Sequence, residues 1–329
     1  MRLKDVARLA EVAPITVSRA LLSPAMVSAA TRRRIDAAIA TTGYIPDLVA
    51  QSLVSNRTGM VGVVIPTIVD SIYASTIAAM SEVLRGNRIQ LLLGDSGYSL
   101  EEEEAIAGAF LARRADALVL STVAHTTTLR RLLSRAGVPV VETGNLTPEP
   151  IDMVVGFSNL RAAFEMTRYL ALRGHRVIGF IGAETQSNPQ ASDRQAGYRR
   201  ALAESGLPLD ERLVIEAPRA IESGGAALRT LLARCPRLDA VFAAGEIWAV
   251  GTLLECLRCG VAVPGQLALA GFNDEMIAGQ LVPALTTVRI PRAQIGRRAA
   301  EMVVGRLSGR AVAPTTVDVG YQIVRRATA

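Results

Sequence analysis

Cysteine and histidine are scarce in this sequence, which has three cysteines and two histidines among 329 residues. Three cysteines are too few for a disulfide framework in a chain of this length. Cys256 and Cys259 form a C-x-x-C pair, but there is no second pair, and His125 and His175 are far away in sequence. Because the pair falls in a segment with a helical pattern, we interpret it as two thiols on a helix face and predict no metal or redox site.

Long apolar runs and catalytic motifs are also absent. No stretch approaches the roughly 20 apolar residues of a membrane-spanning helix. The first ten residues mix charged and small apolar side chains, unlike a secretion signal, so we expect a cytoplasmic protein with no membrane partner. The sequence has no dinucleotide-binding glycine motif, Walker loop, metal cluster or nucleophile elbow. We therefore expect neither an enzyme nor a cofactor.

The excess of basic residues is small and unevenly distributed. The chain has 36 basic and 30 acidic residues, a net charge of +6. Residues 1–58 contain eight of the basic and four of the acidic residues, so this segment carries +4 and the other 271 residues carry +2. An anionic partner such as nucleic acid should therefore bind the N-terminal segment.

Three short helices are predicted in this basic segment. Apolar residues lie on one helix face from residue 3 to residue 10, and Pro14 suits the first position of a second helix of about two turns. A third helix begins after the N-cap Ser28 and ends at Gly43. Two helices joined by a short turn have the geometry of a helix-turn-helix motif, whose second helix enters the major groove of DNA. Any small three-helix bundle has the same pattern, so both interpretations stay open at this point.

From residue 59 onward, short apolar segments alternate with helical patterns. Apolar strands without polar alternation are buried on both faces, and intervening helices imply parallel sheets. We therefore predict an α/β core of two lobes that divide near residue 160. The predicted strands are Met60 to Ile65, Ile89 to Leu93, Ala117 to Leu120, Val138 to Val141, Met153 to Val155, Val177 to Ile181, Ala240 to Ala243 and Leu267 to Ala270.

Ordered motifs extend along the whole sequence. They include Leu3-Lys4-Asp5-Val6-Ala7, Thr16-Val17-Ser18-Arg19, Gly43-Tyr44-Ile45-Pro46, Arg173-Gly174-His175, Arg194-Gln195-Ala196-Gly197-Tyr198, Gly271-Phe272-Asn273-Asp274 and Leu285-Thr286-Thr287-Val288. With these motifs the sequence resembles the lactose-repressor/galactose-repressor (LacI/GalR) family of transcriptional regulators. Within that family, Glu142, Ala124-His125-Thr126, Val155-Gly156-Phe157 and Cys256 are most similar to gluconate-type repressors.

The resemblance implies a domain organisation and partners. It implies a helix-turn-helix head over residues 1–46, a hinge helix or linker over 47–58, and a core over 59–329 with the type I periplasmic-binding-protein fold. The lobes would comprise about 59–160 with 290–318, and about 161–289 with 319–329. Family members bind near-palindromic double-stranded operator DNA as homodimers or tetramers, and a small metabolite between the lobes orders or melts the hinge. The leucine heptads of the tetrameric members are absent, so we expect a homodimer.

The resemblance also implies DNA-binding residues. Pro14, Ile15 and Arg19 would occupy base-reading positions, and Thr16 and Ser18 would hold phosphates. Leu53 would wedge into the minor groove, and Ser28 is a further predicted DNA-binding residue. Pro14 and Ile15 carry no side-chain donor, so Arg19 at a guanine and apolar contacts with thymine methyl groups would supply the direct readout. Leu53 could instead be a packed linker leucine.

Several positions depart from the family pattern. Glu11 and Ala13 stand in the turn where Gly and Ser are usual. Asp47 and Gln51 replace residues that favour phosphate, so we expect an electrostatically modest DNA binder. Residues 32–34, three consecutive arginines, either compensate along the DNA backbone or form a solvated helix face.

Ligands of open α/β sheets bind at the carboxyl ends of the strands, so the residues directly after the apolar segments are the first candidates for effector contacts. These candidates are Thr67 to Tyr73, Asp95 to Tyr98, Ser121, Glu142, Gly182 to Gln190, Gly245, Glu246 and Asn273. Together with the resemblance, they lead us to predict effector contacts from Asp70, Tyr73, Tyr98, Ser121, Glu142, Arg194, Gly245 and Asn273.

The chemistry of these positions favours an anionic effector. The arginine that matches Arg194 in the family clamps ligand oxygens, and a guanidinium grips a carboxylate with two parallel hydrogen bonds. Asn273 stands where an acidic residue is usual, and Gly245 stands where Asn or Asp is usual. Because these acceptors for a neutral sugar are lost, we predict a sugar acid such as gluconate or a keto-gluconate.

Some features keep two interpretations. Trp248 either stacks on a sugar or packs within a lobe. Glu101 to Glu104 begin a helical pattern, where negative charge is favourable, so we predict a solvated first turn there and no metal site. A transport component with the same core fold is the alternative to a repressor, but the DNA-binding head argues against it. Activation instead of repression also stays open.

Overall fold

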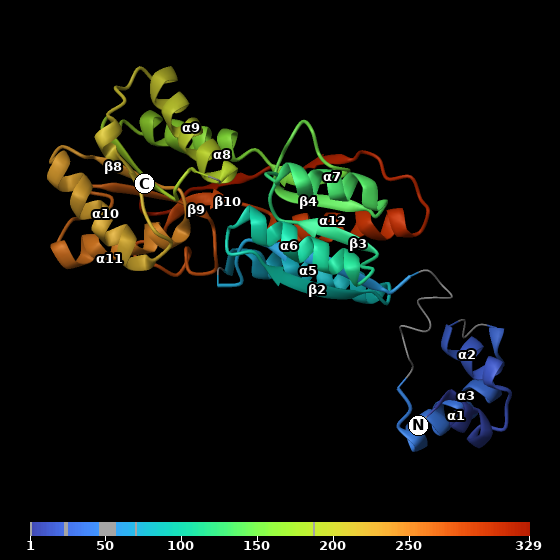
Figure 1. The fold of residues 1–329 in the computed structure, drawn as a ribbon. Helices are drawn as coiled ribbons and strands as arrows, with labels where there is room; N and C mark the ends of the chain where they lie inside the picture. Colours follow the sequence, from blue (N-terminus) through green and yellow to red (C-terminus); the bar gives the residue numbers. More distant parts are fainter. Residues whose placement is uncertain (1, 23–25, 46–56, 70, 187) are drawn as a thin grey trace. The chain divides into compact units, whose positions relative to one another are not determined.

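The computed structural model describes residues 2–22, 26–45, 57–69, 71–186 and 188–329 (Figure 1). The chain divides into two compact units, Met1–Thr58 and Gly59–Ala329. Among the described residues, no helix is both long and apolar enough to cross a membrane.

The N-terminal unit contains the three predicted helices, α1 (Leu3–Leu9), α2 (Pro14–Leu22) and α3 (Ala29–Thr42). Pro14 is the first residue of α2, as predicted. The Ser28 hydroxyl accepts a hydrogen bond from the Thr31 backbone N–H at 3.2 Å, and Gly43 ends α3 with φ +61°. Local capping therefore sets the bounds of α3, while a small apolar core centred on Val6, Val17 and Ile35 holds the helices together.

The first lobe of the core is a parallel six-stranded sheet between two pairs of helices. Its strand order is β11 (Thr316–Asp318), β5 (Met153–Phe157), β4 (Val140–Asn145), β3 (Ala117–Leu120), β1 (Met60–Ile65) and β2 (Gln90–Asp95). The apolar clusters place α6 (Leu100–Ala112) and α7 (Thr127–Ala136) on one face. They place α5 (Ala74–Gly86) and α12 (Arg292–Leu307) on the other.

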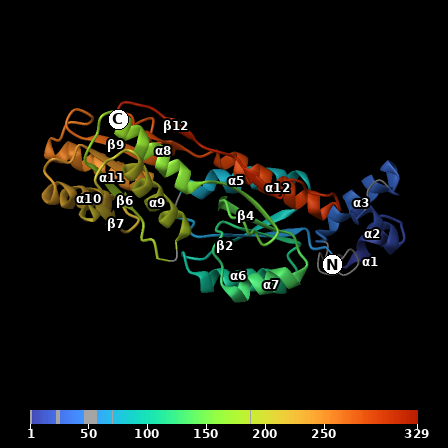
Figure 2. The ribbon, with the colours of Figure 1, turned by 90° about the horizontal axis from the view of Figure 1, so that it is seen from above.

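The second lobe contains the other six-stranded sheet. Its order is β12 (Gln322–Val324), β10 (Thr286–Arg289), β9 (Ala268–Asn273), β8 (Ala240–Ala243), β6 (Ile178–Gly182) and β7 (Val214–Glu216), and β12 alone is antiparallel to its neighbour. The helices α8 (Asn159–Leu172) and α9 (Pro189–Glu204) pack side by side, as do α10 (Ile221–Arg234) and α11 (Glu246–Cys259) (Figures 1 and 2). Short 3-10 helices, Ser71–Tyr73 and Glu211–Leu213, complete the core.

The predicted α/β class is confirmed, and each of the eight predicted strands overlaps an observed one. Four strands were not predicted: β7, β10, β11 and β12. They are three or four residues long and include threonine, glutamine and acidic residues, so they lack the apolar run used to identify the others.

The chain crosses between the lobes at three places. It passes from β5 to α8, from β10 to α12 and from β11 to β12, and in each case the two elements belong to different lobes. The two lobes therefore share three connections (Figure 2).

Glycine permits the close approach of two helix pairs in the core. A Cβ atom on Gly251 of α11 would lie 1.8 Å from the Ile221 carbonyl oxygen at the start of α10. A Cβ atom on Gly296 of α12 would lie 2.0 Å from the Thr76 carbonyl oxygen of α5. Both distances are far inside van der Waals contact, so only glycine fits without a backbone shift. Gly296 thereby sets the position of α12, whose first residue is Arg292.

Candidate functional site

The exposed face of α2 presents predicted DNA-contact residues at the surface of the N-terminal unit. Pro14, Ile15 and Arg19 are exposed, and Ile15 retains 62% of its accessible surface. Val17 and Ala20 on the opposite face are buried in the small core. This division holds the helix in place while it leaves its outer face free for a partner.

The remaining predicted DNA contacts lie beside this face or outside the described residues. Thr16 and Ser18 are half-buried on α2, and Ser28 is exposed as the N-cap of α3. Leu53 lies outside the described residues. In the turn before α2, Glu11 has φ +53°, a conformation that favours glycine, and an exposed ion pair of 3.7 Å joins it to Arg34.

Three adjoining cavities lie between the two lobes of the core. Residues of both lobes line each of them. Tyr73 of the first lobe and Gln190 of the second line all three. We call the first and third the arginine cavities because Arg194 lines both, and the second the serine cavity because Ser96, Ser99 and Ser121 line it.

Arg194 is buried where the arginine cavities meet. It projects from α9, with 8% of its surface exposed. Its Nε donates to Asn159 Oδ1 and its Nη1 donates to the Ala244 carbonyl oxygen, both at 2.8 Å, and the guanidinium lies 4.0 Å from the centroid of the Phe272 ring. The side chain is thus fixed by the protein in a position that faces the cavity.

Two more arginines line the same cavities. Arg292, at the start of α12, donates from Nη2 to Asn273 Oδ1 at 2.6 Å, and its Nε has no hydrogen-bond partner among the described residues. Arg219 lies over the rings of Tyr98 and Trp248, 5.7 and 5.4 Å from their centroids.

Burial and the charges of neighbouring arginines lower the pKa values of Arg194 and Arg292. Burial, followed by the charges of Arg292 and Arg219, lowers the pKa of Arg194 to about 9. Burial also lowers the pKa of Arg292, against an opposing contribution from the nearby Glu275. An arginine with such a pKa is still a cation at neutral pH. Among the described residues that line the arginine cavities there is no aspartate or glutamate, so this part of the cleft is strongly electropositive.

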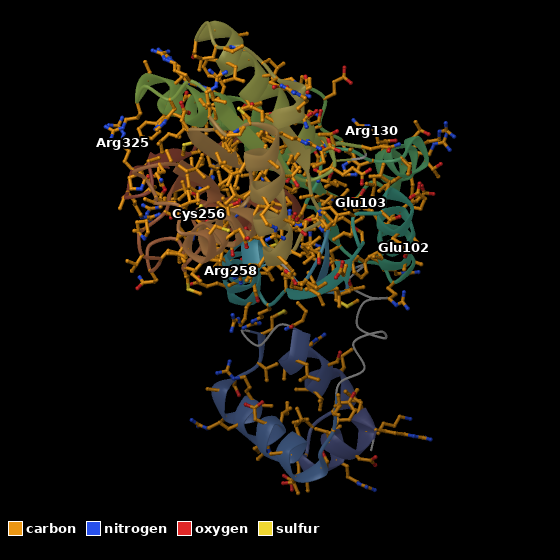
Figure 3. The ribbon with its side chains drawn as sticks, turned by 90° about the vertical axis from the view of Figure 1, so that its left-hand side faces the viewer. Glu102, Glu103, Arg130, Cys256, Arg258 and Arg325 are labelled. Carbon is orange, nitrogen blue, oxygen red and sulfur yellow. The ribbon has the colours of Figure 1, made fainter. Side chains whose placement is uncertain are left out.

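The serine cavity has a different character. Besides its three serines it is lined by Thr122, Tyr98 and the carboxylate residue Glu103 of α6. Glu103 is 2% exposed, and its Oε2 lies 2.7 Å from His125 Nδ1. The prediction of a solvated first turn is therefore wrong for Glu103, because the helix turns this residue toward the sheet, whereas the neighbouring Glu102 is exposed (Figure 3).

His125 links Glu103 to a second buried carboxylate. Its Nε2 lies 3.2 Å from Glu142 Oε1, and Glu142 Oε2 accepts from the Ile151 backbone N–H at 2.6 Å. Burial lowers the pKa of His125, but the hydrogen bonds and charges of Glu103 and Glu142 outweigh it and raise this pKa to about 9. His125 is therefore protonated at neutral pH.

Five of the eight predicted effector residues line the cavities: Tyr73, Tyr98, Ser121, Arg194 and Asn273. Asp70 lies outside the described residues.

Glu142 and Gly245 are not among the lining residues. Glu142 is fully buried on the α6 and α7 side of the sheet, while the next residue of β4, Thr143, lines an arginine cavity. Gly245 is the N-cap of α11, and the Trp248 ring occupies the space where a Cβ would lie, at 2.6 Å.

Trp248 packs within the second lobe, which is one of its two predicted roles, and it also borders the cleft, where the other role, stacking on a sugar, stays a prediction. The residue is 1% exposed in the apolar core of the second lobe, and its Nε1 donates to the Pro218 carbonyl oxygen at 2.8 Å. Its ring also borders an arginine cavity. Cys256 and Cys259 lie on α11, so the helix predicted for this pair is confirmed, and both are free thiols.

The sequence interpretation missed several cavity residues. Arg219 and Arg292 follow strands that had not been predicted, β7 and β10. Had the β-branched pair Thr286-Thr287 been taken as a strand, Arg292 would have followed a carboxyl end like the other candidates. No local signal indicates Asn159, which holds Arg194 from another helix.

Comparisons with known proteins agree over the whole chain. Residues 2–47 match the bacterial regulatory proteins of the lacI family, and residues 167–329 match the periplasmic binding protein-like domain. The chain is 36% identical to the HTH-type transcriptional regulator GntR of Pseudomonas aeruginosa, over 98% of this chain and 94% of that protein. A LacI-family transcriptional regulator from Silicibacter pomeroyi has a similar structure, with a TM-score of 0.91, 32% identity and coverage of 100% of this chain and 99% of that one.

A third similar protein has been solved with a bound sugar. The structure of the transcriptional regulator CelR in complex with cellobiose has a TM-score of 0.74 and 30% identity, and the match covers all of both chains. These relatives are regulators with a DNA-binding head, and this chain is likewise a DNA-binding transcriptional regulator and not an enzyme. The head matches the family model, and a relative that is 36% identical matches nearly the whole chain. The chain therefore belongs to the LacI family of bacterial regulatory proteins.

Proposed function

We propose that the chain is a transcriptional repressor whose effector is a sugar acid of the gluconate type, bound in the cleft between the lobes. One observation carries the proposal. Arg194, Arg219 and Arg292 line the arginine cavities, and none of the described residues that line them is acidic.

Burial of cations without a counterion is unfavourable, because the surrounding protein solvates a charge less well than water does. A ligand carboxylate relieves this by accepting charge-assisted hydrogen bonds from the guanidinium groups. Arg194 is suited to this role because its Nε and Nη1 are already held by the protein, which leaves the rest of the fork to face a ligand.

The hydroxyl groups of an aldonic acid also find partners in the cleft. Tyr73, Tyr98, Gln190 and Asn273 line the cavities beside the arginines, and each supplies a donor, an acceptor or both. A buried sugar hydroxyl needs such a partner to replace the water it loses. The site therefore fits a ligand with one carboxylate and several hydroxyl groups.

A neutral sugar is the second candidate, supported by the cellobiose complex of the CelR relative. It would bring no negative charge to the three arginines that line the arginine cavities. Calorimetric titration of the full chain with gluconate, glucose and glucitol separates the candidates, because glucitol keeps all five hydroxyls of gluconate and has an alcohol in place of the carboxylate. We expect binding of gluconate and at least a hundredfold weaker binding of the two neutral compounds. Binding of glucose without binding of any aldonic acid would contradict the proposal.

For the DNA-binding unit we propose that Pro14, Ile15 and Arg19 face base edges, and that Thr16, Ser18 and Ser28 contact phosphates. The exposure of Ile15 supports a partner at this face. We propose further that Leu53 inserts into the minor groove, that Asp70 contributes to the effector site, and that the chain acts as a homodimer with head 1–46, linker 47–58 and core 59–329.

Selection of bound fragments from a random pool of DNA duplexes tests the DNA-binding proposal. We expect a near-palindromic consensus whose half-sites reflect a two-fold symmetric dimer. An Arg19→Ala variant should relax the consensus at one position in each half-site, by about 1 to 3 kcal/mol. If the wild-type chain selected a single asymmetric half-site, the homodimer proposal would be wrong.

A further inference from the structure

The two ends of the cleft have opposite charge. Three arginines line the arginine cavities, whereas the serine cavity contains Glu103 and none of its described lining residues is an arginine or lysine. Tyr73 and Gln190 line all the cavities, so a single ligand lying along them would reach from one end to the other.

The protein holds Glu103 rigidly at the serine end. Glu103 is 2% exposed, and its Oε2 lies 2.7 Å from His125 Nδ1. His125 is itself held from the other side, because its Nε2 lies 3.2 Å from Glu142 Oε1. The side chains of His125 and Glu142 have no exposed surface, so the three residues form a fixed buried row that ends at the cavity wall.

The charges of this row do not cancel. It contains two carboxylates and one imidazole, so even with His125 protonated it carries a net negative charge. The other lining residues at this end are hydroxyl residues or uncharged, for example Ser96, Ser121 and Thr122. This end is therefore suited to hydroxyl groups, which donate to a carboxylate, and unsuited to a second anion, which Glu103 would repel across a buried space.

Building on the proposed function, we propose that Glu103 is a specificity-determining residue that orients the effector. The carboxylate of the ligand lies against the arginines, its far hydroxyl donates to Glu103, and acids with an anionic group at both ends are rejected. The ligand class is thus narrowed from sugar acids in general to polyhydroxy monocarboxylates. Diacids of the same carbon number and aldonates phosphorylated at the far end are excluded.

Specificity of this kind is a difference of two affinities and includes a repulsive element. The arginines alone would favour a dianion over a monoanion, because each additional negative charge gains attraction. The carboxylate at the serine end reverses that preference. Glu102, the preceding residue on α6, has the same charge but is exposed, so it offers a matched control (Figure 3).

The test is calorimetric titration of the full chain with gluconate and with glucarate, in which a second carboxylate replaces the terminal hydroxyl group of gluconate. For the wild-type chain we expect glucarate to bind at least a hundredfold more weakly than gluconate. The Glu103→Gln variant should weaken gluconate binding, and it should reduce the ratio of the Kd for glucarate to the Kd for gluconate by at least tenfold. The Glu102→Gln variant should leave the ratio unchanged. A third ligand, 6-phosphogluconate, should behave like glucarate.

The outcomes separate this inference from the function on which it rests. Equal affinity of the wild-type chain for gluconate and glucarate would overturn the orientation and leave the sugar-acid effector in place. Binding of neither acid would overturn the proposed function and this inference with it. Because the wild-type comparison is decisive by itself, the inference is tested even if Glu103→Gln does not fold, which thermal unfolding by circular dichroism would reveal.

Discussion

Replacement of Arg194 by methionine should separate effector binding from folding. Methionine replaces the aliphatic part of the arginine side chain and carries no charge. The shift of the Arg194 pKa from its ordinary value of 12.5 to about 9 corresponds to about 5 kcal/mol by which the folded core disfavours this cation, at 1.36 kcal/mol per pKa unit. The variant is relieved of that penalty.

The variant also loses favourable contacts. The Asn159 side-chain oxygen and the Ala244 carbonyl oxygen lose their donors, at about 1 to 3 kcal/mol each. The contact of the guanidinium with the Phe272 ring contributes about 1 to 2 kcal/mol more. Gains and losses nearly cancel, so we expect the free energy of unfolding without ligand to change by less than about 2 kcal/mol.

The effect on effector binding should be much larger. Loss of a two-pronged grip on a carboxylate removes two charge-assisted hydrogen bonds of about 1.5 to 3 kcal/mol each, so the Kd for gluconate should rise at least about a hundredfold. Urea unfolding with and without gluconate measures both quantities. At a ligand concentration of about 100 times the wild-type Kd, the wild-type chain should gain about 2.7 kcal/mol of stability, and Arg194→Met should gain about 0.4 kcal/mol or less.

A matched control and a clear contradiction are available. Arg200 lies on the same helix, is exposed and pairs with Glu204, so Arg200→Met should keep the full stabilisation by gluconate. If Arg194→Met lost more than about 4 kcal/mol of stability without ligand and still responded to gluconate, Arg194 would be a structural cation and the argument would be refuted.

Four further predictions concern other parts of the chain. Glu11→Gly should stabilise the N-terminal unit by about 1 kcal/mol relative to Glu11→Ala, because both remove the carboxylate and only glycine relieves the positive φ; equal melting temperatures would exclude that strain. Burial lowers the pKa of His125, but the two carboxylates outweigh this effect and raise the pKa to about 9. Protonated His125 should therefore contribute about 3 kcal/mol to the free energy of unfolding below pH 6.5, and this contribution should be lost as the pH rises through 9. Urea unfolding of wild type and His125→Gln should therefore converge by pH 10, and a constant difference would contradict the assignment. Gly251→Ala should destabilise the core by about 3 kcal/mol or more, whereas Gly108→Ala, in open space on α6, should be neutral or stabilising by up to about 1 kcal/mol in the same assay. Leu53→Ala should reduce operator bending in a gel-phasing assay with unchanged gluconate affinity, and an unaltered bend would refute the wedge.

The N-terminal unit was predictable because its signals are local. Proline at a first helical position, a serine cap and a terminal glycine each act within a few residues, and Pro14, Ser28 and Gly43 occupy these places in the structure. The apolar strands were predictable for a similar reason, since burial on both faces leaves an uninterrupted run. The ends of β2, β4 and β9 lie two to four residues beyond the predicted ends, because each strand continues past its apolar run to a polar residue.

The cavity residues were harder to predict because they depend on which face of a strand or helix a side chain occupies. Successive residues of a strand point to opposite faces, so Glu142 and Thr143 separate at the end of β4. Glu142 turns to His125 behind the sheet, while Thr143 reaches the cleft. The solvated turn predicted at the start of α6 failed on the same point, since helical periodicity buries one residue in three or four and here buries Glu103.

The three connections between the lobes limit how the cleft can move. A single link would leave one lobe free to swivel and twist on the other, and two would still permit rotation about the line that joins them. Three connections join the lobes, from β5 to α8, from β10 to α12 and from β11 to β12. They restrict the relative motion of the lobes to approximately a rotation about one hinge axis. An anion bound between Arg194 and Arg292, as we propose for the effector, would therefore displace the two lobes in one defined direction.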